Sequence, residues 1–254
     1  MAFASGYNRV KQTRHGFVIY NSGDEYVGRS FDAYGECVEA EVQYVLSLVT
    51  PDAVVMDVGA NFGALTLPLA RKVRQVFAFE PQREAFLALA GTMALNGLAN
   101  VTCENVALGA RPGFVRVPPL DFHGTNNIGG VSMDTERLGP GYDVRSETLD
   151  GYVERNGITR LDLVKVDVEG MEEQVLRGGV ATLKRLRPIL YLEADRPDKV
   201  PALKAFVAGL GYSLEPHEPP LFNPHNFFGN PANVWGRNIV SINLVCRPGP
   251  GDAA

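Results

Sequence analysis

Short apolar runs of strand length alternate with longer amphipathic segments along most of the chain. Residues 53–56 form the first apolar run, and residues 64–73 form an apolar segment of helical length behind a glycine-containing turn. Further strand-length runs lie at residues 76–79, 101–108, 161–166 and 188–193, and further helical segments at residues 36–49, 81–97, 148–156, 171–186 and 200–210. Because strands that alternate with helices build a parallel sheet covered on both faces, the pattern predicts an α/β fold.

The last two apolar runs have no helix between them. They cover residues 212–215 and 238–246, and a loop rich in proline, asparagine and phenylalanine joins them. Parallel neighbours need a crossover connection, whereas antiparallel neighbours do not. The sheet is therefore predicted to be mostly parallel with one antiparallel edge strand.

Two stretches show no clear hydrophobic period. Residues 1–35 predict only a short hairpin, over residues 16–20 and 26–27, and we regard them as an N-terminal extension or cap. Residues 109–147 are rich in glycine and proline. Long loops inside compact domains are usually functional or disordered. Because this one lies between two strands expected to contribute to the site, residues 123–130 are predicted to form a lid or a substrate-binding loop.

The turn after the first apolar run carries the pattern of a nucleoside site. Asp57 ends the run, and Gly59 and Gly63 follow it at a Gly-x-x-x-Gly spacing. Glycine allows a ligand to approach the backbone closely and tolerates positive φ. Glu80 ends the next predicted strand, where a carboxylate can accept hydrogen bonds from both hydroxyls of a ribose. A strand, a glycine turn, a helix and an acid after the next strand together favour nucleoside binding over an ordinary tight turn.

The charges near this turn indicate which nucleoside fits. A dinucleotide site typically has G-x-G-x-x-G, so that a pyrophosphate lies on the amino terminus of the helix. Here the glycine spacing differs, and Asp57 would repel a pyrophosphate. S-adenosyl-L-methionine carries a sulfonium and an α-ammonium group, so its charge suits this acid better than the charge of NAD does.

Composition excludes several other classes. The 254 residues are enough for one large α/β domain, and 45% apolar with 21% charged residues is ordinary for a globular protein. No apolar run is long enough to span a membrane, and the amino terminus lacks the apolar core of a signal peptide. Three widely spaced cysteines suggest neither a disulfide framework nor a zinc cluster, so the expected location is the cytoplasm. A net charge of −5 without a basic run argues against nucleic acid as a partner.

Four short pieces of the sequence are similar to the FkbM family of S-adenosylmethionine-dependent methyltransferases. They are Met56 to Gly63, Phe79-Glu80-Pro81, Asn105 to Leu108, and Lys165-Val166-Asp167-Val168-Glu169-Gly170-Met171-Glu172, the last being the most distinctive. The resemblance implies a class I methyltransferase fold, which is Rossmann-like, with seven strands of which one is reversed. It places the methyltransferase domain at residues 36–248, after the extension 1–35 and before a disordered tail, residues 249–254.

The resemblance also implies which residues contact the cofactor. Those expected around its methionine part are Asp57, Gly59, Asn61 and Gly63. Those expected around its adenosine part are Glu80 and Pro81 at the ribose and Asn105 and Ala107 at the adenine, although Asn105 also suits an ordinary turn. Glu36 resembles part of an N-terminal element that closes over the cofactor, but Cys37 stands where the family usually has an aromatic residue.

Methyl transfer to oxygen requires alignment of donor and acceptor and removal of a proton from an alcohol. Asp167 ends the fourth predicted strand and is expected nearest to the transferred methyl group and the cofactor. Lys165 and Glu169 are two positions away on either side, so strand alternation predicts that all three face one region. The alternative is that Glu169 caps the next helix and Lys165 pairs with an acid. His217, after the sixth strand, is either a general base or a structural hydrogen-bonding group.

Several polar residues are candidates for binding the acceptor. They are Asn126 and Asn127 in the predicted lid, Glu193 after the fifth strand, and His217, Asn223 and Asn226 in the C-terminal part. The asparagines of the last loop alternate with aromatic residues, as in a polar–aromatic pocket or in a loop that packs on itself. Asp167 and Glu193 together could hold a divalent metal, but no third ligand is spaced to complete the site, so a metal is not favoured.

The sequence therefore favours an enzyme that methylates a hydroxyl of a small molecule or glycan in sugar or natural-product biosynthesis. One alternative is an N-methyltransferase that acts on a peptide or an amide side chain. Another, from a different class, is a non-catalytic cofactor-binding partner in a biosynthetic complex. We expect a small-molecule, glycan or peptide acceptor, no nucleic-acid or membrane partner, and leave a homo-oligomer open.

Overall fold

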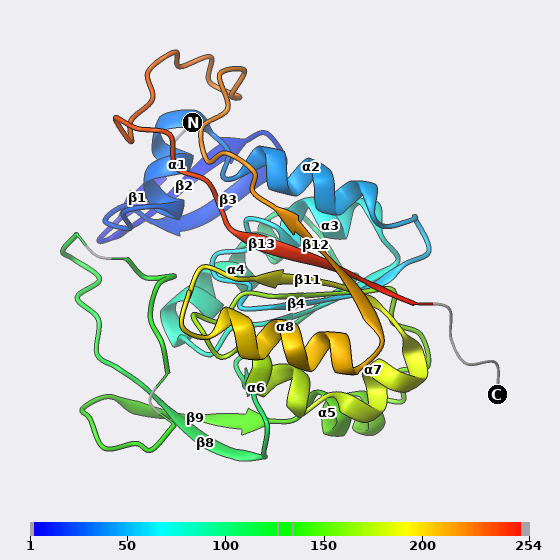
Figure 1. The fold of residues 1–254 in the computed structure, drawn as a ribbon. Coiled ribbons are helices and arrows are strands. Elements are labelled where there is room, and N and C mark those ends of the chain that lie inside the picture. The colour runs from blue at the N-terminus through cyan, green and yellow to red at the C-terminus, as the bar shows by residue number, and fades with distance from the viewer. Residues whose placement is uncertain (1–2, 126, 134, 250–254) are drawn as a thin grey trace.

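The computed structural model describes residues 3–125, 127–133 and 135–249. Its centre is a seven-stranded sheet with the strand order β12-β13-β11-β10-β4-β5-β6 (Figure 1). The bounds of these strands are β4 Val54–Val58, β5 Gln75–Phe79, β6 Val101–Glu104, β10 Leu163–Val166, β11 Ile189–Glu193, β12 Tyr212–His217 and β13 Asn243–Pro248. β13 runs antiparallel to both neighbours, β11 and β12, and the strands from β11 to β6 are parallel. The predicted α/β fold with one reversed strand is confirmed, and the reversed strand lies just inside the edge strand.

Helices cover both faces of this sheet, as the alternating pattern predicts. Their bounds are α2 Glu39–Ser47, α3 Thr66–Lys72, α4 Arg83–Leu95, α5 Leu149–Arg155, α6 Glu172–Arg177, α7 Val180–Leu186 and α8 Val200–Gly209. The apolar sides of α5, α6, α7 and α8 share one buried cluster with the sheet, whereas α2 and α3 share another cluster on the opposite face. Every residue of β4 and of β10 is buried, because helices cover both faces there.

The N-terminal segment has more structure than the sequence predicts. It forms a three-stranded antiparallel sheet, with β1 Phe3–Ser5, β2 Asn8–Thr13 and β3 Gly16–Asn21, and then the helix α1 Val27–Tyr34. The strand expected at residues 26–27 is therefore wrong. Phe31 and Tyr34 are buried on one side of α1, and with Val27 they have the i, i+4, i+7 spacing of a helix.

Two predicted elements are divided. The run 101–108 gives β6 and a separate strand, β7 Ala107–Leu108, which joins a small sheet with β8 Gly113–Val117 and β9 Tyr142–Glu147. The run divides because Asn105 donates through Nδ2 to the carbonyl oxygens of Glu80 and Pro81 and turns the chain. The helix expected over residues 171–186 is interrupted at Gly178, whose backbone lies so close to the carbonyl of Gly109 that a Cβ would be 2.1 Å from that oxygen.

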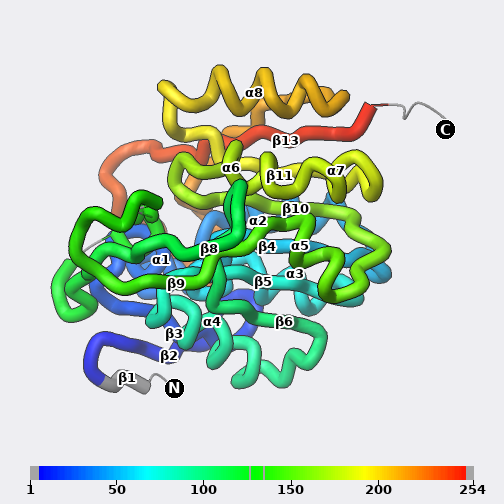
Figure 2. Tube along the Cα trace, turned by 90° about the horizontal axis from the view of Figure 1, so that it is seen from below, coloured from blue at the N-terminus to red at the C-terminus, as the bar shows by residue number. Residues whose placement is uncertain are grey.

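The N-terminal segment meets the loop between β12 and β13. Figure 1 shows this loop reaching over α1, and β8 and β9 lie below the central sheet in Figure 1 and in front of it in Figure 2. Tyr34 accepts a hydrogen bond from Phe228 N and donates one to the carbonyl of Ala232. Within the described part of the chain, every helix falls short of the length and apolarity needed to cross a membrane.

Candidate active site

The backbones that follow β4 and β10 are in direct contact. Gly59 has φ +80°, and a Cβ on it would be 1.8 Å from the carbonyl oxygen of Asp167. Asp167 N donates to the carbonyl of Val58 at 3.0 Å, which holds the two strand ends together. Any side chain at Gly59 would separate them, so the glycine expected from the sequence is required by this contact.

Glu80 lies at the end of β5 with both carboxylate oxygens already oriented. Its Oε2 accepts from Asn61 N at 2.8 Å, and its Oε1 accepts from Gln82 N at 2.8 Å. Burial raises the pKa of this carboxyl to about 7. Each carboxylate oxygen has a second lone pair, so the group can still accept two hydroxyl donors.

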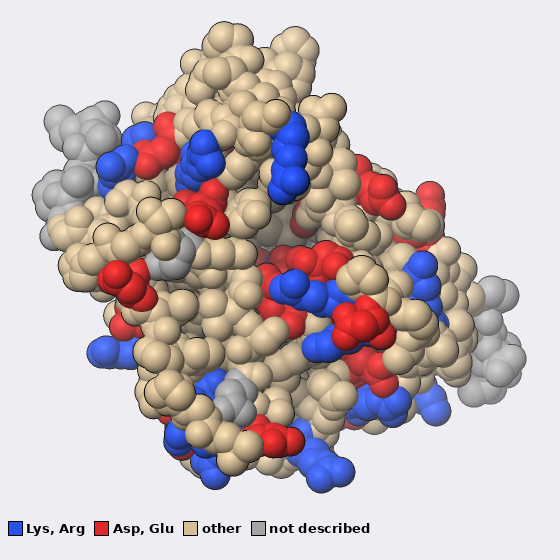
Figure 3. All heavy atoms as spheres, turned by 60° about the vertical axis from the view of Figure 1, so that its left-hand side comes forward, with Lys and Arg blue, Asp and Glu red and all other residues tan. Residues whose placement is uncertain are grey.

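A narrow slot and a larger cavity adjoin at these strand ends. The slot is lined on one side by Pro81 and Ala107, and the cavity has a volume of about 560 Å³. The residues that line both are Gly59, Glu80, Gln82, Gly129, Asp167 and Glu169. Figure 3 shows acidic side chains gathered in a hollow on this face, with basic side chains beside them. Gly59 and Glu80, which were expected to bind a nucleoside, therefore border a continuous cleft, whereas Asp57 is fully buried and lines neither part of it.

Lys165 is buried beneath the cleft and paired with acids. Its Nζ lies 3.1 Å from Asp167 Oδ2 and 3.5 Å from Asp57 Oδ1, and it donates to the carbonyl of Gly59 at 3.0 Å. Burial lowers the pKa of Lys165. The charges of Asp167, Asp57 and Glu41 raise it by more, so the net shift of the pKa is upward. Lys165 remains an ammonium group, and the pairing interpretation of this residue fits the structure better than proton handling.

Strand alternation does not extend to Glu169. β10 ends at Val166, and Glu169 has φ +57°, in the left-handed region. Its carboxylate pairs with Arg196 rather than capping the next helix. Glu172, the first residue of α6, orders the turn before the helix instead, since its Oε1 accepts from Gly170 N at 2.9 Å, and α6 has no side-chain cap. Glu169 and Asp167 line the same cleft, as predicted. Strand alternation is not the cause, because Glu169 lies outside the strand.

Three carboxylates from the ends of β10 and β11 converge on the cavity. Asp167, Glu169 and Glu193 each have one oxygen within 4.8 Å of the others. Burial, the charges of Asp167 and Glu169, and a hydrogen bond with Asp167 raise the pKa of Glu193. Of the Asp167 side chain, 38% is exposed, so this carboxylate is open to a bound molecule.

A loop crosses the cleft and is fixed from two sides. Ile128 N donates to Asp24 Oδ2 at 2.9 Å, and Gln82 Nε2 donates to the carbonyl of Ile128 at 2.6 Å. Asn127 lines the larger cavity, while Asn126 is outside the described residues. Sequence reasoning missed Asp24 and Gln82, since neither carries a local signal. The predicted lid therefore has a defined anchor beside the site.

Some candidate residues serve the frame of the site instead of lining it. Asn105 turns the chain after β6, as described above, and Gly63 packs against α4, where a Cβ would be 2.9 Å from Leu89 Cδ1. His217 Nδ1 is 2.8 Å from the hydroxyl oxygen of Tyr191, and its ring stacks on Tyr44 at 3.9 Å. Burial lowers the pKa of His217. His217 is not among the described residues that line the slot or the cavity, so its structural interpretation fits better.

The N-terminal segment contacts the loop between β12 and β13 at Glu36, Asn223 and Asn226. Glu36 accepts from Asn223 Nδ2 at 2.7 Å and pairs with Arg14 at 2.6 Å. Asn226 donates through Nδ2 to the carbonyls of Asn223 and Asn230. The cavity wall from this loop consists of other residues, Leu221 and 239–242. The loop thus contributes to the site mainly through residues that the sequence did not single out.

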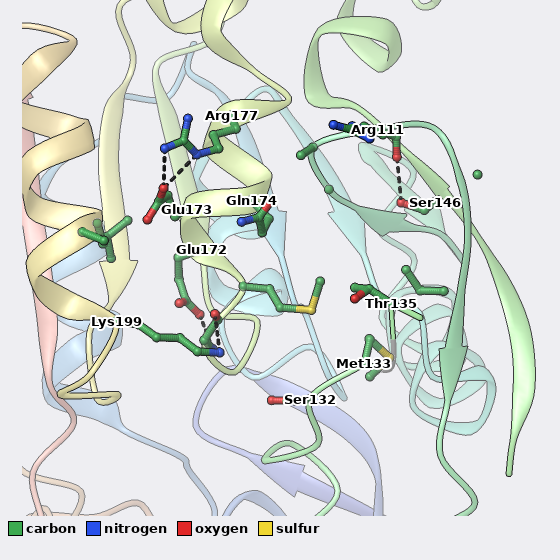
Figure 4. A pocket seen from close by; sticks show the side chains of 18 of the residues that line it. Arg111, Ser132, Met133, Thr135, Ser146, Glu172, Glu173, Gln174, Arg177 and Lys199 are labelled. Carbon is green, nitrogen blue, oxygen red and sulfur yellow. Dashed lines mark hydrogen bonds and ion pairs between the residues drawn. The ribbon is translucent and has the colours of Figure 1, made fainter. Parts of the chain in front are cut away.

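A wider groove of about 980 Å³ lies outside the strand ends, between the β8–β9 hairpin and the starts of α6 and α8 (Figure 4). Met133 and Met171 line both this groove and the slot. Its charged side chains are largely engaged: Arg177 pairs with Glu173, and Lys199 donates to the carbonyl of Gly170.

The sequence matches the model of the methyltransferase FkbM domain over residues 57–214, more than half of the chain. The chain belongs to the FkbM methyltransferase family. It is therefore an enzyme that transfers methyl groups, and the match includes the strand ends that carry Asp57, Glu80, Asp167 and Glu193.

Named relatives support the FkbM assignment. The chain is 29% identical over 171 residues to 2-O-methyltransferase NoeI of Sinorhizobium fredii, covering 59% of this chain and 67% of that protein. It is 26% identical over 168 residues to hexuronic acid methyltransferase AglP of Haloferax volcanii, covering 65% of each protein. A crystal structure of methyltransferase FkbM from Methylobacillus flagellatus KT has a TM-score of 0.53 at 15% identity, covering 78% of this chain and 44% of that one. The likeness to this last structure shows the shared FkbM fold, and the chain spans less than half of its length.

Proposed function

We propose that this FkbM family member transfers a methyl group from S-adenosyl-L-methionine to a hydroxyl of a small molecule or glycan. The observation that carries the proposal is the continuity of the cleft. Glu80 and Gly59 line the nucleoside slot, and the same cleft opens into a cavity where Asp167 is exposed. A donor held in the slot would face an acceptor beside a carboxylate.

The residues of the slot fit the proposed donor. Gly59 lines the slot with backbone alone, and Glu80 keeps lone pairs for two ribose hydroxyls. Gln82 Oε1 and Asn61 Oδ1 are buried and accept no hydrogen bond among the described residues, so each can receive a donor from a ligand. Asp167 supplies negative charge where the slot meets the cavity, whereas Asp57 is buried beneath and paired with Lys165.

When bound, S-adenosyl-L-methionine supplies a methyl group that is activated by the sulfonium. The chain's part is to align the acceptor oxygen and to take up the hydroxyl proton. Asp167 is the group placed for this, since it is the exposed carboxylate of the converging set. Lys165 holds Asp167 in position from beneath, and Glu193 hydrogen-bonds to it.

The names of the relatives favour oxygen as the acceptor atom. One is named a 2-O-methyltransferase and another a hexuronic acid methyltransferase. Methylation of nitrogen stays the alternative within enzymes. A silent cofactor-binding role is disfavoured, because the match to a methyltransferase family model includes Asp167.

The function is tested by incubating the protein with isotope-labelled S-adenosyl-L-methionine and a panel of glycosides, polyols and amide-containing peptides. The expected result is an acceptor whose mass rises by one CH₂ unit, with the label on oxygen by NMR. A label found only on nitrogen would support the alternative. Release of no label to any acceptor, with no S-adenosyl-L-methionine bound, would refute an enzyme of this kind.

We expect activity to survive removal of divalent metals. Arg196 already pairs with Glu169 and Lys165 with Asp167, and the raised pKa of Glu193 favours its uncharged form, so the three carboxylates need no further cation. Dialysis against a chelator should leave the turnover rate unchanged. Loss of activity that Mg²⁺ restores would contradict this expectation and assign the carboxylates to a metal.

Replacing Glu80 with glutamine is expected to weaken binding of S-adenosylhomocysteine by about 1–3 kcal/mol, the usual cost of losing charged hydrogen bonds. Glutamine has one acceptor oxygen and cannot accept from both Asn61 N and Gln82 N, nor from both ribose hydroxyls. Titration calorimetry measures the change. An exposed substitution on α5, Glu154→Gln, is the matched control. An unaltered dissociation constant in Glu80→Gln would remove Glu80 from the ribose site.

Cofactor affinity is expected to fall as the pH drops below about 7. Burial raises the pKa of Glu80 to about 7 in the free protein, whereas ribose hydroxyls favour its charged form, so a proton must leave as the nucleoside binds. Affinity should fall about tenfold per pH unit below this pKa and level off above it. Calorimetry at pH values from about 5.5 to 8 measures the profile. Glu80→Gln should flatten the profile, and an equally steep profile in that variant would assign the proton to another group.

A further inference from the structure

The cavity beside the methyl-donor slot is lined by an excess of negative charge. Besides Glu80, its lining includes four acidic side chains from the ends of β10 and β11, Asp167, Glu169, Glu193 and Asp195. Arg196 is the sole basic residue among the described residues that line it. The acidic side chains of this lining therefore outnumber its basic one.

Arg196 is not free to receive an anion. Its Nη2 pairs with Glu169, and its Nε lies 3.5 Å from Asp195 Oδ1. Lys165, the nearest other cation, lies beneath Asp167 and pairs with it and with Asp57. A carboxylate or phosphate entering the cavity would thus meet like charges without an unpaired cation to offset them.

Unused hydrogen-bond acceptors point into the same region. Glu193 Oε2 and Asp195 Oδ1 are buried and accept no hydrogen bond among the described residues, although Arg196 Nε lies 3.5 Å from Asp195 Oδ1. Buried acceptors are costly to leave without a donor. Hydroxyl groups of a bound molecule can donate to them, whereas ether or ester oxygens cannot.

The mouth of the cavity is apolar. Tyr26, Val240 and Ile242 line it and are 37%, 42% and 41% exposed. The ring of Tyr26 stacks on Trp235 at 5.6 Å, so it forms a fixed flat wall. An acceptor seated with its hydroxyls on the acidic floor would place its other end against this rim.

We propose that the methyl acceptor is a polyhydroxyl compound without negative charge, carrying an apolar group, and that the acidic floor rejects anionic analogues. This inference rests on the proposed methyltransferase function. Hydroxyls donate to Glu193 and Asp195, the apolar group contacts the rim at Tyr26, and a uronate or a sugar phosphate is repelled. The charge of the acceptor is thus selected by residues that follow β11.

The test uses matched probes that differ in one charged group. Phenyl glycosides of glucose, galactose and mannose are compared with the corresponding phenyl uronides and with the methyl esters of those uronides. Binding is measured by calorimetry and by ligand-observed NMR on the full chain saturated with S-adenosylhomocysteine. At least one neutral glycoside is expected to bind about tenfold or more tightly than its uronide, and the methyl ester should recover most of the loss. Added salt should reduce the difference in affinity between the glycoside and its uronide.

A double substitution tests the residues. Glu193→Gln with Asp195→Asn should reduce the discrimination against uronides, whereas the exposed control Glu154→Gln should leave it unchanged. Uronides that bind as tightly as glycosides to the unaltered protein would overturn the proposal, and so would failure of every neutral glycoside to bind while S-adenosylhomocysteine does. Failure of S-adenosylhomocysteine to bind would instead count against the proposed function itself. Retained binding of S-adenosylhomocysteine shows that the double variant is folded.

Discussion

Replacing Asp167 with asparagine is expected to lower kcat about one hundred- to ten-thousand-fold, the range for loss of a general base. The asparagine side chain has nearly the same shape and still offers an oxygen to Lys165, which lies 3.1 Å from the carboxylate. It cannot take up a proton from a hydroxyl. Cofactor affinity should therefore change little while turnover falls. Steady-state kinetics and calorimetry with S-adenosylhomocysteine separate the two quantities.

The matched control for this experiment is Asp52→Asn. Asp52 precedes β4 at the opposite end of the sheet and is exposed, with Arg160 3.5 Å away. The substitution Asp52→Asn makes the same chemical change outside the site, and kcat should stay at the level of the unaltered protein. A normal kcat in Asp167→Asn would remove Asp167 from the chemistry and direct attention to Glu193.

Replacing Lys165 with methionine is expected to lower the free energy of unfolding by about 3–5 kcal/mol, as when one partner of a buried ion pair is removed. Asp57 is fully buried, and without Lys165 it would keep only the hydrogen bond from Thr66 Oγ1 at 2.6 Å. The carbonyl of Gly59 would also lose its donor. Urea unfolding followed by circular dichroism measures the change.

Two further variants locate the source of this loss. Lys204→Met makes the same substitution on the exposed side of α8 and should have little effect. Adding Asp57→Asn to Lys165→Met should recover part of the lost stability, because the unpaired buried charge is then absent. A loss below about 1 kcal/mol in Lys165→Met, the usual value for an exposed ion pair, would mean that the pairing contributes little.

The positions of the residues proposed to bind the nucleoside were predictable because their signals are local. Buried apolar runs identify β4 and β5, and Asp57, Gly59 and Glu80 follow them directly in the sequence. Parallel strands bring their carboxyl ends to one edge of the sheet, so these residues meet without further information. The structure adds the reason for Gly59, which is the close approach of β10.

The acceptor side was less predictable because its contacts join distant parts of the chain. Glu36 bonds to Asn223 across 187 positions, and Ile128 bonds to Asp24 across 104. No periodic pattern reports such pairs. The wall that results comes from residues near Tyr26 and from residues 239–242, which the sequence alone did not single out.

The alternation of side chains along a strand predicts the position of Lys165 but not that of Glu169. It holds within β10 and brings Lys165 toward Asp57, its partner in the register of β4. Beyond Val166 the backbone leaves the strand, and Glu169 and Gly170 both have positive φ. The position of Glu169 is then set by its pairing with Arg196, which a sequence pattern does not contain.

The central claim is that the cleft at the ends of β4, β5 and β10 holds S-adenosyl-L-methionine through Glu80 and the glycine turn. Calorimetric titration of the protein with S-adenosylhomocysteine at about pH 8 measures this most directly. One site with a dissociation constant below about 1 mM, weakened in Glu80→Gln, is the expected result. Absence of heat with both S-adenosylhomocysteine and S-adenosyl-L-methionine, in a protein that unfolds cooperatively, would contradict it.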